Sequence, residues 1–81
     1  MMDKIAEYIK EEVANEPLTD IDSQEDLLGG GIIDSVGMMK LVLFLENEFD
    51  VKIGPGDMTV ENFLNLDSIE SFLLKRKQET G

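Results

Sequence analysis

The chain is 81 residues long and 42% hydrophobic, which suffices for one small domain with a single core and argues against intrinsic disorder. The absence of cysteine and histidine excludes disulfide bonds, thiolate nucleophiles, the common zinc sites and the commonest general base. A net charge of −11 disfavours binding to nucleic acid or anionic lipid and favours basic partners, although such a charge also simply keeps a small protein in solution.

No stretch of about 20 apolar residues is present, so we expect no membrane span. The first ten residues, MMDKIAEYIK, mix charged with apolar side chains and do not resemble a signal peptide, which favours a cytoplasmic protein. We expect residues 1–81 to form a single domain that acts as a monomer.

The first segment shows apolar residues at three- and four-residue steps, which predicts an amphipathic helix over residues 3–15. Asp3 is expected to cap it, and Pro17 to end it, because proline disfavours helix at the residue before it. The recurring apolar residues are Ile5, Tyr8, Ile9 and Val13.

A long first loop is expected over residues 16–34, where helical periodicity is weak. The loop contains too many apolar side chains for a free linker, so it should pack on the helices. These side chains are Leu18, Ile21, Leu27, Leu28, Ile32 and Ile33. The run Gly29–Gly31 should supply a sharp turn before Ile32.

The strongest helical pattern covers residues 35–49, with Asp34 or Ser35 as its N-cap. One face of this helix should contact the core and the opposite stripe should face outward. The core face consists of Met38, Leu41, Val42, Leu45 and Phe49, and the outward stripe of Val36, Lys40, Leu43 and Asn47. Nine of the fourteen residues from 36 to 49 are apolar, so either this helix is central or part of its outward face binds a partner.

Shorter elements follow. The stretch VKI at 51–53 should be extended, and GPG at 54–56 should form a turn. Thr59 should begin a short helix, and Asp67 should cap a last helix with Glu70 at the spacing of a capping box. The side chains expected to face inward are Phe63, Leu64, Ile69, Phe72 and Leu73.

The last helix is expected to end in three cations, Lys75, Arg76 and Lys77, whose charge suits the negative end of the helix dipole. The sequence therefore predicts an all-α fold, a small bundle of three main helices plus one short helix, with a long first loop.

Two roles are open for Ser35, at the start of the strongest helix. It can be only a helix cap, or its hydroxyl can be an attachment point. It cannot be a hydrolytic nucleophile by the usual route, because no histidine is present to accept its proton and Lys40 lies too far around the helix. We therefore expect no enzyme activity and no catalytic residue. A phosphate ester would suit the positive end of a helix.

Calcium binding is a further possibility for a small acidic chain. Residues 20–31, DIDSQEDLLGGG, begin like an EF-hand loop with Asp20 and Asp22. However, Glu25 stands where the loop needs glycine, and Gly31 stands where it needs a bidentate glutamate. We expect an acidic solvated loop and no metal site.

Two strings, GIIDSVGMMKLVLFLENEFDVKI at 31–53 and MTVENFLNLDSIESF at 58–72, resemble the acyl and peptidyl carrier protein family. The matching elements of the first string are Asp34, Ser35, Val36, Leu41, LENEF at 45–49, Val51 and Ile53. The second string resembles freestanding carriers that serve a separate acyl- or aminoacyl-activating ligase. The resemblance covers about residues 5–76.

The resemblance implies that a phosphopantetheinyl transferase attaches 4′-phosphopantetheine from coenzyme A to Ser35, and that Asp34 helps to position the divalent metal of the transferase. The arm would carry an acyl or aminoacyl group, as a thioester, from its activating ligase to downstream acyl-processing enzymes. The residues that would dock these partners are Val36, Gly37, Lys40, Leu43 and Asn47.

The chain departs from the family in the triple glycine at 29–31, in IGPG at 53–56, and at two positions after Ser35. Carriers of primary fatty-acid synthesis commonly read Asp-Ser-Leu-Asp-Thr-Val-Glu, whereas Gly37 and Lys40 stand here in place of the last aspartate and the glutamate. With both residues expected to be exposed, the departure favours a specialised biosynthetic pathway with a separate adenylating ligase. The alternatives are a carrier of fatty-acid biosynthesis and, in a different class, an unmodified acidic protein-interaction module.

Overall fold

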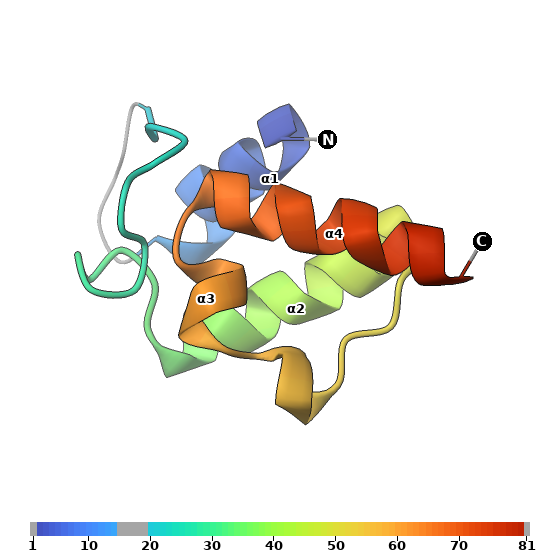
Figure 1. Ribbon diagram of the computed structural model, residues 1–81. Helices are drawn as coiled ribbons and strands as arrows, with labels where there is room; N and C mark the ends of the chain where they lie inside the picture. Colours follow the sequence, from blue (N-terminus) through green and yellow to red (C-terminus); the bar gives the residue numbers. More distant parts are fainter. Residues whose placement is uncertain (1, 15–19, 81) are drawn as a thin grey trace.

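The computed structural model describes residues 2–14 and 20–80 (Figure 1). Within these residues the chain forms helices and no strand. The elements are α1 (Met2–Tyr8), the π-helical segment η1 (Ile9–Val13), α2 (Ser35–Phe49), the 3₁₀-helical segment η2 (Pro55–Asp57), α3 (Val60–Phe63) and α4 (Leu66–Thr80). The predicted all-α fold, with three main helices, one short helix and a long first loop, is confirmed.

The first helical segment consists of α1 and η1 and ends in a wide turn. It begins one residue earlier than predicted, so Asp3 lies in the first turn and is not the cap. At the other end the Ala14 N–H donates to the Ile9 carbonyl oxygen, five residues back, at 2.7 Å. Ala14 itself is extended, so the helix ends before residue 15, which lies outside the described residues.

The described part of the first loop packs on the helices, as predicted. Its buried apolar residues are Ile21, Leu27 and Ile33, whereas Leu18 lies outside the described residues. Two backbone hydrogen bonds tie this loop to the junction of α3 and α4. The Leu27 N–H donates to the Leu64 carbonyl oxygen at 2.8 Å, and the Asp67 N–H donates to the Ser23 carbonyl oxygen at 3.1 Å.

The glycine run forms the sharp turn that the sequence predicted. Gly31 has a φ of 78°, in the left-handed region that costs glycine little and other residues more. Its N–H donates to the Leu28 carbonyl oxygen at 3.2 Å. The turn directs the chain from the loop toward the start of α2.

The structure at the start of α2 shows which residue is the N-cap of this helix. The Asp34 Oδ1 atom accepts the Gly37 N–H at 2.7 Å, so Asp34 is the N-cap and Ser35 is the first helical residue. The helix ends at Phe49, where Asp50 takes a left-handed φ of 53°. The predicted bounds of this helix are confirmed.

The inward face of α2 agrees with the prediction at its centre. Leu41, Val42 and Leu45 are buried, whereas the outer members of the predicted face, Met38 and Phe49, are only half-buried. The expectation that Phe49 is buried is therefore wrong. Phe49 is the last residue of α2, and its ring packs edge-on against another ring of the same helix, that of Phe44, which is itself only half-buried.

Thr59 caps α3 as predicted, but α4 begins earlier than expected. The Asn65 Oδ1 atom accepts the Ser68 N–H at 2.7 Å, so Asn65 is the cap of α4 and the predicted capping box at Asp67 is wrong. Asp67 lies in the first turn instead, where its charge still suits the positive end of the helix. The helix continues to Thr80, so only Lys77 of the three predicted cations lies in its last turn.

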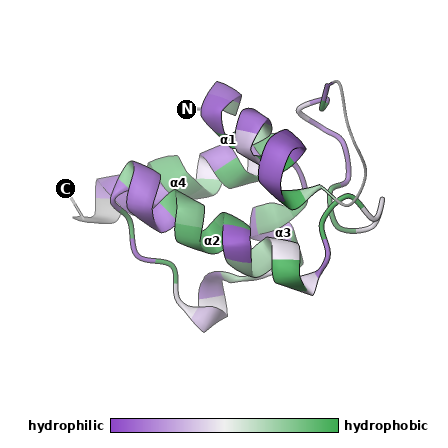
Figure 2. Cartoon of the chain, turned by 180° about the vertical axis from the view of Figure 1, so that it is seen from behind, coloured by the Kyte–Doolittle hydropathy of each residue, from purple (hydrophilic) through white to green (hydrophobic). Residues whose placement is uncertain are grey.

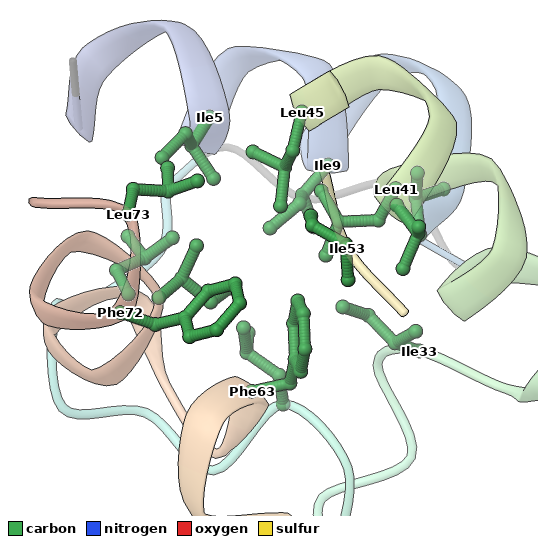
Figure 3. Close-up of a cluster of buried hydrophobic side chains, with 14 of the residues drawn as sticks. Ile5, Ile9, Ile33, Leu41, Leu45, Ile53, Phe63, Phe72 and Leu73 are labelled. Atoms are coloured by element: carbon green, nitrogen blue, oxygen red, sulfur yellow. The ribbon is translucent and has the colours of Figure 1, made fainter. Parts of the chain in front are cut away.

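The three long helical segments surround one apolar core. Figure 3 shows side chains from every helical element except η2 directed toward a common centre. The largest wholly buried side chains are Phe63, Ile5, Ile9, Leu27, Leu41, Leu45, Leu66, Ile69 and Leu73. Apolar and polar residues alternate along the helices, as expected for amphipathic elements around a core (Figure 2). The predicted inward positions of α3 and α4 are confirmed at Phe63, Ile69, Phe72 and Leu73, while Leu64 is half-buried.

The course of the chain places the end of η1 beside the start of α2. In Figure 1, α2 and α4 run in the same direction and α1 runs the opposite way. The Lys77 Nζ atom donates to the Phe49 carbonyl oxygen at 2.9 Å, which joins the far ends of α4 and α2. None of the helices within residues 2–14 and 20–80 combines the length and hydrophobicity of a membrane-spanning segment.

Candidate functional site

Ser35 is the first residue of α2, and its side chain is exposed. The neighbouring Asp34 is also exposed, although its carboxylate is held by the Gly37 N–H. The other amides of the first turn have no carbonyl partner within the helix, so they create positive potential at the helix start. The hydroxyl of Ser35 is therefore accessible at a position that favours an attached anion.

An open pocket of about 460 Å³ lies beside Ser35. Its lining residues are Leu28, Ile33, Asp34, Ser35, Met38 and Met58, so most of the wall is apolar. The wall combines the first loop, the start of α2 and the residue that follows η2. Met58, from a distant part of the sequence, thus meets residues 28–38 next to the serine hydroxyl.

The predicted outward stripe of α2 is exposed at all four positions: Val36, Lys40, Leu43 and Asn47. Two of its members are apolar, Val36 with 64% and Leu43 with 58% of the side-chain surface exposed. Met39, which the sequence interpretation left out, is 63% exposed and belongs to the same surface. Its position three residues after Val36 and four before Leu43 is the helical spacing that could have identified it. We call Val36, Met39 and Leu43 the apolar strip.

Gly37 is buried, so the expectation that it is an exposed docking residue is wrong. A Cβ atom built at this position would lie 2.9 Å from Val13 Cγ1, and 3.3 Å from both Ile33 Cγ2 and Asp34 Oδ1. The physical reason is that η1 packs directly on this turn of α2. The wheel of α2 alone could not reveal this contact.

The surroundings of Ser35 carry little charge for so acidic a protein. Lys40 is the one charged residue from 35 to 45, and the acids of α2 lie in its second half. Glu46 Oε2 accepts the Ile53 N–H at 2.9 Å, and Glu48 pairs with Lys4 at 2.8 Å. The hydrogen bond and charge of Glu48 raise the pKa of Lys4. Across the described residues, no group of three or more acidic side chains gathers to hold a metal ion.

An exposed hydroxyl at a helix start, beside an apolar pocket and an apolar strip, suits a small all-α domain that presents a bound group to other proteins. The family described as the phosphopantetheine attachment site matches residues 3–73 of this chain, and the chain belongs to that family. It is a non-catalytic carrier of covalently attached 4′-phosphopantetheine, and its partner enzymes include a transferase and a ligase. The alternative of an unmodified interaction module is therefore excluded.

Two curated relatives share part of this sequence. The D-alanyl carrier protein of Streptococcus sanguinis (strain SK36) is 41% identical over 54 residues, which cover 64% of this chain and 67% of that protein. The D-alanyl carrier protein of Streptococcus gordonii (strain Challis) is 39% identical over 54 residues, with the same coverage of each chain. Both are named as carriers of one aminoacyl group.

The residues at the start of α2 fit a phosphopantetheine group. Its phosphodiester would lie at the positive helix end, where unpaired amides favour an anion. The pocket wall formed by Leu28, Ile33, Met38 and Met58 lies next to the Ser35 hydroxyl, and Asp34 is the one charged residue among those that line the pocket. When bound, the group supplies a terminal thiol that holds the cargo as a thioester.

Proposed function

We propose that Ser35 is the residue that carries 4′-phosphopantetheine, and that the chain is an aminoacyl carrier loaded by a separate adenylating ligase. The observation that carries this proposal is the exposed hydroxyl of Ser35 at the first position of α2, next to the capping carboxylate of Asp34. That carboxylate is exposed, so it can also meet a metal ion held by the transferase. We assign Asp34 to this positioning of the metal.

We further propose that the partner enzymes dock on the apolar strip together with Lys40 and Asn47. The strip begins one residue after Ser35 and continues along the same face of α2. Three exposed apolar side chains in a row are unusual on a small acidic domain unless a partner covers them. The Asn47 Nδ2 atom donates to the Leu43 carbonyl oxygen at 3.0 Å, which holds this exposed side chain at the end of the strip.

The cargo that we propose is a D-alanyl group, because both curated relatives are named D-alanyl carrier proteins. The lack of acids after Ser35, in the first half of α2, supports a dedicated ligase over the enzymes of fatty-acid synthesis, whose carriers commonly read Asp-Ser-Leu-Asp-Thr-Val-Glu at this point. One exposed serine and one apolar strip suffice to present a single group to an enzyme, so we propose that the carrier acts as a monomer.

Attachment is tested by incubating the protein with coenzyme A, magnesium and a phosphopantetheinyl transferase of broad specificity. The mass should increase by one phosphopantetheine group in the parent and in Ser71→Ala, an exposed serine in the middle of α4, and not in Ser35→Ala. Replacing an exposed serine at the first position of a helix by alanine should change the free energy of unfolding little, and Asp34 still caps the helix. Ser35→Ala should therefore remain folded. A mass increase that persists in Ser35→Ala would contradict the assignment.

The cargo is tested on the modified protein with ATP and a D-alanine-activating ligase. The protein should gain one alanyl residue in a linkage that hydroxylamine cleaves, as expected for a thioester. L-Alanine with the same ligase should react more slowly, and a fatty acid supplied with an acyl-loading enzyme should react slowly as well. Efficient loading with a fatty acid and none with D-alanine would refute the aminoacyl assignment while leaving the attachment site intact.

A further inference from the structure

Gly37 stands in the third position of a long helix, where glycine is unfavourable. Glycine within a helix is less favourable than alanine, so an alanine with free space around it would stabilise α2. The space is not free. A Cβ atom would lie 2.9 Å from Val13 Cγ1 on one side and 3.3 Å from Ile33 Cγ2 on another.

The atoms around Gly37 have little room to move. Val13 is buried and β-branched, so its side chain has few alternative rotamers. The backbone of η1 is fixed by the hydrogen bond from the Ala14 N–H to the Ile9 carbonyl oxygen at 2.7 Å. Ile33 is buried in the core as well. An added methyl group must therefore displace η1 or the first turn of α2.

The first turn of α2 holds both groups that the proposed reaction needs. Ser35 lies two residues before Gly37, and the Gly37 N–H is the donor to the Asp34 carboxylate at 2.7 Å. A Cβ atom at position 37 would also lie 3.3 Å from that same Asp34 oxygen. Any displacement of the turn thus changes the position of the Ser35 hydroxyl. Any movement of the Asp34 carboxylate changes the hydrogen bond by which Asp34 caps α2.

We propose that Gly37 is a positioning residue for the transfer of phosphopantetheine: by allowing Val13 to pack directly on the backbone of α2, it sets where Ser35 and Asp34 stand. The proposal rests on the assignment of Ser35 as the attachment residue. It assigns Gly37 no contact with the transferase or with coenzyme A, since the residue is buried.

The test compares the parent with Gly37→Ala, Val13→Ala and the double variant, using a broad-specificity transferase and coenzyme A at a temperature where circular dichroism shows each protein folded. Gly37→Ala should lower kcat about tenfold or more, because misplacement of a reacting group by about 1 Å is costly. The KM should change less than about twofold, because Met39 and Leu43, which form most of the apolar strip, lie beyond the first turn. Gly56→Ala is the matched control, since a Cβ atom there meets nothing within 4 Å.

Removing the opposing methyl groups should reverse the defect. Val13→Ala in the Gly37→Ala background should restore most of the lost kcat, whereas Val13→Ala alone should lower kcat less than Gly37→Ala does. If Gly37→Ala is too unstable to assay, the double variant must fold and accept the group at close to the parent rate. Unchanged kcat in Gly37→Ala, or a double variant no better than Gly37→Ala, would overturn the proposal. A parent that is modified at a residue other than Ser35, or not at all, would instead refute the attachment assignment.

Discussion

Leu45 and Leu43 offer a matched pair, because the two leucines lie two residues apart on α2 and face opposite ways. Leu45 is wholly buried, with 0% of its side chain exposed, whereas Leu43 is 58% exposed in the apolar strip. Truncation of each to alanine should therefore separate the stability of the fold from recognition by partners. Leu45→Ala should weaken the fold, and Leu43→Ala should weaken loading.

The magnitude for Leu45 follows from its complete burial. Replacing a buried leucine by alanine costs about 2–5 kcal/mol, because apolar surface is lost and a cavity is left. A domain of this length has a total stability of roughly 4–12 kcal/mol, so the loss is a large fraction of it. A loss of about 3 kcal/mol lowers the Tm of such a domain by roughly 12–24 °C.

Leu43→Ala should behave in the opposite way. The side chain of Leu43 is exposed and does not pack in the core, so its truncation should change the free energy of unfolding by less than about 0.5 kcal/mol. Alanine has the higher helix propensity, which offsets any small loss. Loading by the adenylating ligase should fall about tenfold if Leu43 lies at the centre of the interface, where truncation costs more than about 1 kcal/mol.

The assays are urea unfolding followed by circular dichroism, and kcat/KM for loading of the modified protein by its ligase. Each variant is measured in both assays. The reasoning fails if Leu45→Ala keeps the parent Tm, because the helix would then be rotated from its assigned orientation. It also fails if Leu43→Ala destabilises the fold as much as Leu45→Ala, because the strip would then belong to the core.

Two further predictions concern charged residues. Arg76→Gln should lower the free energy of unfolding by about 1–3 kcal/mol, because the Arg76 guanidinium donates to Asp57 and lies 5.3 Å from the centre of the Phe72 ring. Lys75→Gln changes an exposed neighbour and is the control: in the same unfolding assay it should change this free energy by less than about 0.5 kcal/mol. Lys40→Glu should leave the Tm unchanged, weaken loading by the dedicated ligase and improve transfer by fatty-acid synthase enzymes, with kcat/KM measured at low and high salt. Lys52→Glu reverses a charge on an exposed residue outside α2, so equal effects of the two reversals would show that net charge alone is responsible.

The start of α2 could be predicted from sequence because its signals are local. An aspartate directly before an apolar run with a period of 3.6 residues marks a helix start, and that period alone places Val36 and Leu43 opposite Leu41 and Leu45. The exposed position of Ser35 follows from its place in the same turn. Each of these inferences requires only residues within a few positions of one another.

The errors arose where distant segments meet. The cap of α4 is Asn65 and not Asp67, and the first loop binds the backbone of the same turn through Ser23 and Leu27, a contact that the local sequence does not reveal. The partial exposure of Phe49 depends on how far the other elements extend along α2. The role of Arg76 in binding Asp57, nineteen residues earlier, also depends on the tertiary fold.

Gly37 shows how such a contact changes a functional interpretation. From sequence, the glycine and Lys40 were two equivalent losses of negative charge on a docking surface, and both were expected to discriminate against the same partners. The structure separates them, since the glycine is covered by Val13 and only the lysine reaches solvent. An aspartate at position 37 would therefore act first on the packing of η1 and on the Asp34 cap, before it could act on any partner. The charge that distinguishes this carrier at the start of α2 is consequently that of Lys40 alone. A partner that recognises Lys40 needs an acidic group opposite it, beside an apolar surface that covers the apolar strip.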